Sequence, residues 1–132
     1  MTQPSEYTSL VTTTLEGGAF YISAAKLIEI QISDTTFSTN FAGTSGGGFY
    51  FATAADRVDV KITNGVINSN KAKAGHGGFM YMPVTSLSSD VIIDSSELTA
   101  NLASVDGGVF YMAGAPTAIK FLKLTNLGKI DN

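Results

Sequence analysis

The chain has little of several residue types that many functional classes need. It contains no cysteine and no tryptophan, and it has a single histidine, His76, and a single arginine, Arg57. The missing cysteines exclude a disulfide framework and thiol catalysis. Charged residues make up 14% of the chain and the net charge is −3, so no basic surface is expected that would bind nucleic acid.

Long apolar segments are also absent. No apolar run reaches the roughly 18 residues that a membrane-spanning helix needs, so no membrane span is expected. Residues 1–9 lack the basic start and apolar stretch of a secretory signal, which leaves either a chain that is not exported or a piece of a longer protein. The hydrophobic share of 44% predicts a folded core. The length of 132 residues predicts a single domain over residues 1–132.

What the chain does contain is an internal repeat. A glycine pair followed by an aromatic segment occurs four times, beginning at Gly17, Gly46, Gly77 and Gly107, at steps of 29, 31 and 30 residues. An asparagine and an alternating apolar run recur at the same step, the latter as Ile30/Ile32, Val60/Ile62, Val91/Ile93 and Leu122/Leu124. Three landmarks with one period indicate a repeat architecture.

The repeat unit reads as strands rather than helices. Its apolar residues are spaced by two and are mostly β-branched or aromatic, and glycine interrupts every unit. A propeller blade needs about 40 to 50 residues, whereas about 30 residues with three short strands and three turns fit one coil of a β-helix. The sequence therefore predicts an all-β, right-handed parallel β-helix of about four coils.

Stacked coils place equivalent residues in columns. The core column is expected to contain Phe20, Phe49, Met80 and Phe110, accompanied on the same strand face by Ile22, Phe51, Met82 and Met112. A third column joins Phe37, Ile67 and Leu98, continued by Ile130. The paired glycines are expected to turn one corner in a backbone conformation that side chains disfavour, and a second corner is expected at Asp34-Thr35, Asn64-Gly65 and Ser95-Ser96.

The two short motifs resemble the alternating GGA[ILV] and FxxN motifs of the polymorphic outer membrane protein repeats of chlamydial adhesins. Gly17-Gly18-Ala19-Phe20 approximates the first motif, and Phe37-Ser38-Thr39-Asn40 fits the second. The later glycine segments depart from the family pattern at Gly48, Phe79 and Val109. The resemblance implies a β-helix of the pectin-lyase-like class with a role in surface display and adhesion, and it carries over no catalytic residues.

Three asparagines form one column: Asn40, Asn70 and Asn101. If they face inward, each amide can bond to the next, which satisfies polar groups that burial would otherwise leave unpaired. We expect a structural ladder at this column rather than a ligand site.

Four tyrosines form a second column, on the opposite strand face from the core Phe and Met residues: Tyr21, Tyr50, Tyr81 and Tyr111. One interpretation is a flat aromatic strip that binds sugar rings or the wall of a neighbouring protein. The other is a stack that only stabilises the sheet through pairs on one face. Both interpretations stay open at this point.

Three carboxylates, Glu29, Asp59 and Asp90, form a third, outward-facing column. Like charges repeated at the strand spacing of about 4.8 Å repel unless they are screened or bridged, so a Ca²⁺ site is conceivable. Lys61 on the same face offers relief instead, and solvated carboxylates are the favoured interpretation. We expect no cofactor.

Signs of catalysis are few. Lyases of this fold class need clustered aspartates and a basic residue in a groove. Asp56 and Arg57 are neighbours, but Arg57 is the only arginine. No coil carries a long insertion that would form the side of a groove. His76 has no Ser or Asp at a spacing that marks a triad. We expect a protein that is not an enzyme.

The two ends of the predicted solenoid suggest a function. A β-helix exposes unpaired strands at both ends unless a helix or a charged strand covers them. Residues 1–11 show no amphipathic helix. At the other end, the charged residues that would oppose pairing of the last strands are Lys120, Lys123 and Lys129. We expect the first and last strands to share a wall, and the partner to be a second copy stacked head to tail or flanking coils of a longer chain. The expected function is structural, as a surface-display stalk or a subunit of an extracellular fibre, located extracellularly or at the cell surface. The alternative is a glycan-binding adhesion module that uses the tyrosine column.

Overall fold

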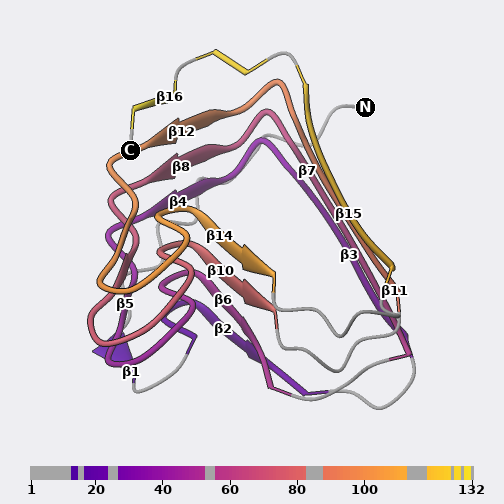
Figure 1. Cartoon of the computed structure of the whole chain (residues 1–132). Helices are drawn as coiled ribbons and strands as arrows, with labels where there is room; N and C mark the ends of the chain where they lie inside the picture. The colour runs from indigo at the N-terminus through magenta and orange to yellow at the C-terminus, as the bar shows by residue number, and fades with distance from the viewer. Residues whose placement is uncertain are drawn as a thin grey trace.

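The computed structural model describes residues 13–14, 17–23, 27–52, 56–82, 88–112, 119–125, 127–128 and 130–131. All regular secondary structure in these residues is β-strand, and every strand pairing is parallel. Figure 1 shows the coils lying over one another, with equivalent strands side by side. The chain forms a parallel β-helix, which confirms the fold class that the period predicts. Within the described ranges, no helix offers a long apolar segment suited to crossing a membrane.

Each coil has four short walls. Wall A contains β1 (Thr13–Thr14), β5 (Phe41–Ala42), β9 (Lys71–Ala72) and β13 (Leu102–Ala103). Wall B contains β2 (Phe20–Ile22), β6 (Phe49–Phe51), β10 (Met80–Met82) and β14 (Phe110–Met112). Wall C contains β3 (Leu27–Ser33), β7 (Arg57–Thr63), β11 (Ser88–Asp94) and β15 (Ile119–Thr125). Wall D contains β4 (Thr36–Ser38), β8 (Val66–Asn68), β12 (Glu97–Thr99) and β16 (Ile130–Asp131).

One expectation about the walls is wrong. The sequence predicts three strands per coil, whereas wall A adds a fourth strand of two residues directly after each asparagine. The first described strand, β1, lies in wall A and the last, β16, lies in wall D, while the expectation that the chain's first and last strands share a wall involves residues 1–12, which lie outside the described residues. Strands of two residues are too short to show the alternation by which strands are recognised, and this is why wall A escapes the sequence pattern.

The register between coils follows the repeat. Tyr50 pairs with Tyr81, Val60 with Val91, and Ile67 with Leu98. Ile130 pairs with Leu98 in turn, which places it in the expected column. The columns of like residues are therefore a property of the backbone pairing.

The glycine corner needs glycine for two separate reasons. The first glycine of each pair has a positive φ, 67° at Gly77, where a Cβ would meet the carbonyl oxygen of Met80 in the same turn. The second glycine lies close to the next coil, and a Cβ at Gly78 would lie 2.7 Å from the amide nitrogen of Leu102. The pair thus combines a left-handed turn with close contact between coils.

Two other corners repeat a left-handed conformation without glycine. Between walls C and D the residues with positive φ are Asp34, Asn64 and Ser95, at 51°, 53° and 51°. Between walls D and A they are Thr39, Ser69 and Ala100, at 56°, 57° and 52°. The first set lies at the corner that the sequence predicts, where short polar side chains tolerate this conformation.

The core is complete only in the middle coils. Phe49 and Met80 are buried, as expected, at 1% and 0% exposure. Phe20 is 41% exposed and Phe110 is half-buried, because β2 and β14 are the outermost described strands of wall B. The expected core column is therefore buried at its centre and open at both ends.

Candidate functional site

The four tyrosines form one continuous stack on wall B. Consecutive ring centroids from Tyr21 to Tyr50, Tyr81 and Tyr111 are 5.5, 5.0 and 5.6 Å apart, with interplanar angles of 11°, 12° and 2°. Parallel rings at these separations overlap face to face, in the offset arrangement that aromatic quadrupoles favour. The faces of the middle rings are therefore covered by neighbouring rings. Tyr21, at the open end of the wall, is 58% exposed.

His76 extends this stack, which the sequence interpretation missed. Its ring centroid lies 4.3 Å from that of Tyr111 at an angle of 26°, and 6.5 Å from that of Tyr81. Its Nδ1 lies 3.3 Å from Oδ2 of Asp106. Gly77 N donates to Asp106 O as Gly46 N donates to His76 O, so the two side chains occupy one column. Their spacing of 30 residues is the signal that identifies the pair.

The three asparagines are buried and hydrogen-bonded in series. Asn40 Nδ2 donates to Asn70 Oδ1 at 2.8 Å, and Asn70 Nδ2 donates to Asn101 Oδ1 at 2.8 Å. Asn70 Nδ2 also donates to Phe37 O at 2.9 Å, and Asn101 Nδ2 donates to Ile67 O at 2.9 Å. The amides thus fasten the corner between walls D and A from coil to coil.

The ladder has a direction. In both links, the earlier coil donates and the later coil accepts, and the backbone amides of Asn40 and Asn70 donate to the same Oδ1 atoms, at 3.3 and 3.1 Å. Asn40 Oδ1 is buried, and no donor for it lies among the described residues. The first amide of the ladder is therefore less well satisfied than the second.

The three carboxylates lie in register on the outer face of wall C. Glu29 pairs with Asp59, and Asp59 pairs with Asp90. Arg57 Nε lies 2.8 Å from Asp59 Oδ2, and Arg57 Nη2 lies 3.8 Å from Asp90 Oδ2. The expectation that Lys61 relieves the repulsion is wrong, because Arg57 occupies this place.

The electrostatic effect of this pairing is visible on Arg57. The hydrogen bond from its guanidinium to Asp59, with the charge of Asp59, raises the pKa of Arg57 above its ordinary value. Gln31 Nε2 donates to Glu29 Oε1 at 3.1 Å, so the first carboxylate also has a neighbour on its own strand. Among the residues that the structure places, no three His, Cys, Asp or Glu side chains converge as metal ligands. The carboxylate column is therefore arranged around a guanidinium and an amide.

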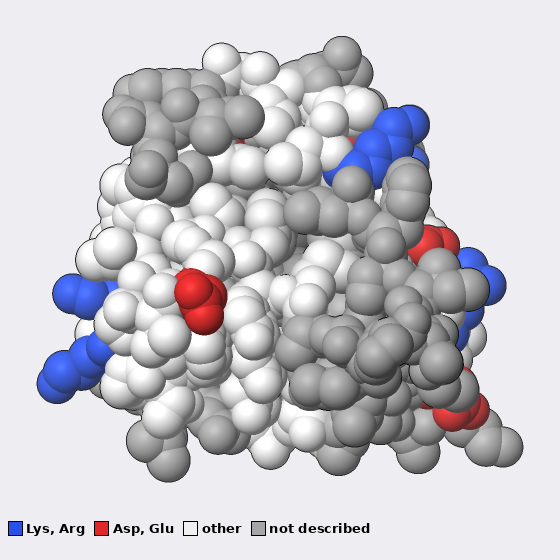
Figure 2. Space-filling model, viewed as in Figure 1, with Lys and Arg blue, Asp and Glu red and all other residues white. Residues whose placement is uncertain are grey.

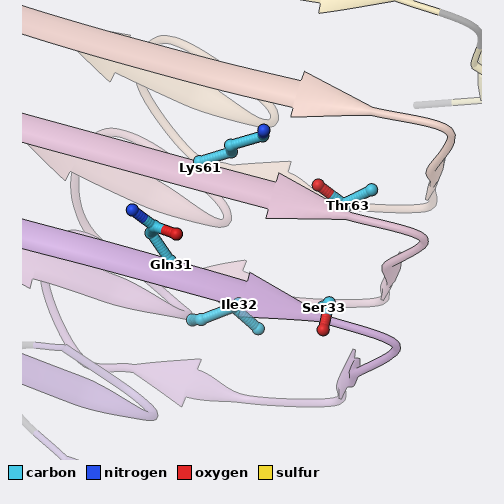
Figure 3. A pocket seen from close by; sticks show the side chains of 5 residues that line it. All are labelled: Gln31, Ile32, Ser33, Lys61 and Thr63. Atoms are coloured by element: carbon cyan, nitrogen blue, oxygen red, sulfur yellow. The ribbon is translucent and has the colours of Figure 1, made fainter.

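Two depressions on the surface are lined by described residues of wall C. One is lined by Gln31, Ile32, Ser33, Lys61 and Thr63, at the end of wall C. Figure 3 shows Gln31 and Lys61 on neighbouring strands, side by side along the wall. The face shown in Figure 2 carries few charged side chains among those described. A second depression on wall C is lined by Glu29, Arg57, Asp59, Lys61 and Asp90 among others, so the acidic and basic side chains of the carboxylate column lie together there.

Comparison with known proteins gives no relative: no family model, no curated protein and no solved structure matches this chain.

Proposed function

We propose that the chain is a non-catalytic structural protein whose β-helix continues by end-to-end stacking, as a subunit of an extracellular fibre or a segment of a surface-display stalk. The observation that carries this proposal is the state of the apolar columns at the two ends. Ile62 and Ile93 are 0% exposed in the middle of wall C, whereas Leu124 in the last strand is 40% exposed. An apolar side chain that is exposed at the end of an otherwise buried column is the kind of surface that a partner covers.

The surroundings of the polar residues support a structural role rather than a catalytic one. The buried polar column, Asn40 to Asn101, is used in coil-to-coil hydrogen bonds. His76 packs against tyrosine rings, and its nearest carboxylate, Asp106, is 65% exposed. The resemblance to polymorphic outer membrane protein repeats, with the location at a cell surface that it implies, is part of this proposal.

A glycan-binding module on the tyrosine column is the competing proposal. Sugars pack against the faces of aromatic rings, but the faces of Tyr50 and Tyr81 are covered by their neighbours in the stack. The column presents ring edges over most of its length. This arrangement favours the sheet-stabilising interpretation of the tyrosines.

Sedimentation velocity over a wide concentration range, combined with negative-stain electron microscopy, tests the structural proposal. We expect the sedimentation coefficient to increase with protein concentration, and electron microscopy to show linear particles. A chain that keeps its strand content but sediments only as a monomer at high concentration contradicts end-to-end stacking. A glycan array with the wild type and Tyr81→Ala tests the competing proposal, since sugar binding that is lost in the variant would favour the adhesion module.

A further inference from the structure

We propose that two copies dock in one register, in which the second copy continues all four walls. In this register β1 of the second copy follows β13 of the first, and β2, β3 and β4 follow β14, β15 and β16. This inference rests on the proposed end-to-end assembly and adds to it the register and the charged residues that select it.

The first argument is the order of the strands. The described path runs through walls A, B, C and D from β1 to β16, with four strands in every wall. Wall D contains the last strand, so the next strand along this path belongs to wall A. The strands β13 to β16 form the fourth described coil, as β1 to β4 form the first. A second copy whose β1 follows β13 therefore continues every wall, whereas a shift by one wall would leave a gap or an overlap.

The second argument is the fit of the apolar columns. The register places Phe20 of the second copy beside Phe110, and Ile32 of the second copy beside Leu124. Phe20 is 41% exposed and Leu124 is 40% exposed, whereas Phe49 in the middle of the Phe20 column is 1% exposed. At these two columns the contact between copies thus repeats the contact that already joins one coil to the next.

The third argument is charge. Glu29 is the one charged residue of β3, and β15 contains Lys120 and Lys123. In the proposed register Lys123 lies opposite Gln31 of the second copy and diagonal to Glu29 of the second copy. Diagonal pairs across parallel strands are within reach of long side chains, and the chain uses one between coils, where Arg57 Nη2 lies 3.8 Å from Asp90 Oδ2. The head-to-tail contact therefore brings opposite charges together.

A charge-reversal experiment tests the register. Glu29→Lys and Lys123→Glu are made singly and together, and association is measured by sedimentation at low salt. Each single variant is expected to associate at least about tenfold more weakly, because each juxtaposes like charges at the interface. The double variant and an equimolar mixture of the two single variants are expected to recover association. Glu97→Lys, at an exposed position of β12 in the third coil, is the matched control and is expected to leave association unchanged.

Electron microscopy of the particles gives an independent measure. Four coils at about 4.8 Å each predict an axial rise of about 19 Å per copy. Single variants that associate like the wild type, a mixture that does not recover, or a rise that is not four coils would overturn the register while leaving assembly intact. A wild type that never associates would overturn the proposed assembly and this inference with it.

Discussion

The ring of Phe79 fills the space that a side chain at Gly48 would need. A Cβ built on Gly48 would lie 2.6 Å from Cε2 of Phe79, and Phe79 itself is 0% exposed. Its centroid lies 5.4 Å from those of both Phe37 and Phe49. The two positions at which consecutive coils depart from the glycine motif therefore compensate each other, because a larger residue in one coil is matched by the smallest residue in the preceding coil.

This relationship predicts strong coupling between the two positions. Gly48→Ala is expected to destabilise the fold by about 1 to 3 kcal/mol through overpacking, and Phe79→Ala by about 3 to 5 kcal/mol through the cavity it leaves. The double variant is expected to cost clearly less than the sum, since the truncated ring makes room for the new methyl group. Urea unfolding followed by circular dichroism measures all three values, and additive values would contradict the packing described above.

The asparagine ladder predicts a graded loss of stability. Asn70→Ala removes two donated and two accepted hydrogen bonds inside the wall and is expected to cost about 3 kcal/mol or more, because the remaining buried partners lose their bonds. Asn40→Ala is the matched control, since its Oδ1 has no donor among the described residues, and its effect is expected to be smaller. Equal unfolding midpoints for the two variants would show that the additional hydrogen bonds of Asn70 add nothing to stability.

One corner is strained and can be improved. Thr39 has a φ of 56°, a conformation that β-branched residues rarely adopt, and its side chain is exposed. Thr39→Asn is expected to raise stability by about 0.5 to 1 kcal/mol, because asparagine tolerates left-handed backbone and the strain of such residues is about 1 to 3 kcal/mol. Thr36→Asn, three residues earlier in β4, is expected to lower stability, since it replaces a half-buried strand residue. A decrease in the thermal midpoint of Thr39→Asn would contradict this account.

The sequence is informative where a physical requirement recurs at the coil period. Left-handed turns and close contact between coils require glycine at Gly77 and Gly78 in every unit, and these glycines reveal the coils. Wall A does not follow from the sequence, because a strand such as Phe41–Ala42 has no side-chain pattern of its own. The choice of Arg57 over Lys61 as the partner of Asp59 also does not follow, because both lie two positions from Asp59 on one face and only the folded geometry decides between them.

The carboxylate column predicts a salt-dependent effect. Arg57→Gln is expected to lower the thermal midpoint at low salt, because Glu29, Asp59 and Asp90 then lie in register without the guanidinium. The deficit is expected to shrink as salt screens the exposed carboxylates. Lys61→Gln is the control, since among the described residues Lys61 forms no ion pair, and a deficit of equal size in both variants would refute the specific role of Arg57. If calcium chloride raises the thermal midpoint of Arg57→Gln more than sodium chloride of equal ionic strength does, the carboxylate column can bind Ca²⁺ once the arginine is removed.

The two lysines of β15 predict opposite effects on assembly. Lys120 pairs in register with Ser89, in the column that contains the buried residues Ile28 and Val58. A lysine at a core register position of an edge strand opposes further pairing, so Lys120→Val is expected to strengthen end-to-end association, by about tenfold if it removes about 1.4 kcal/mol of cost. Lys123 is aligned with Lys61 on the outer face of wall C, where the proposed register uses its charge, so Lys123→Val is expected to weaken association. Sedimentation of both variants beside the wild type measures the two shifts. Shifts in the same direction would mean that only the net charge of the strand matters, and would remove the distinction between a residue that limits docking and one that directs it.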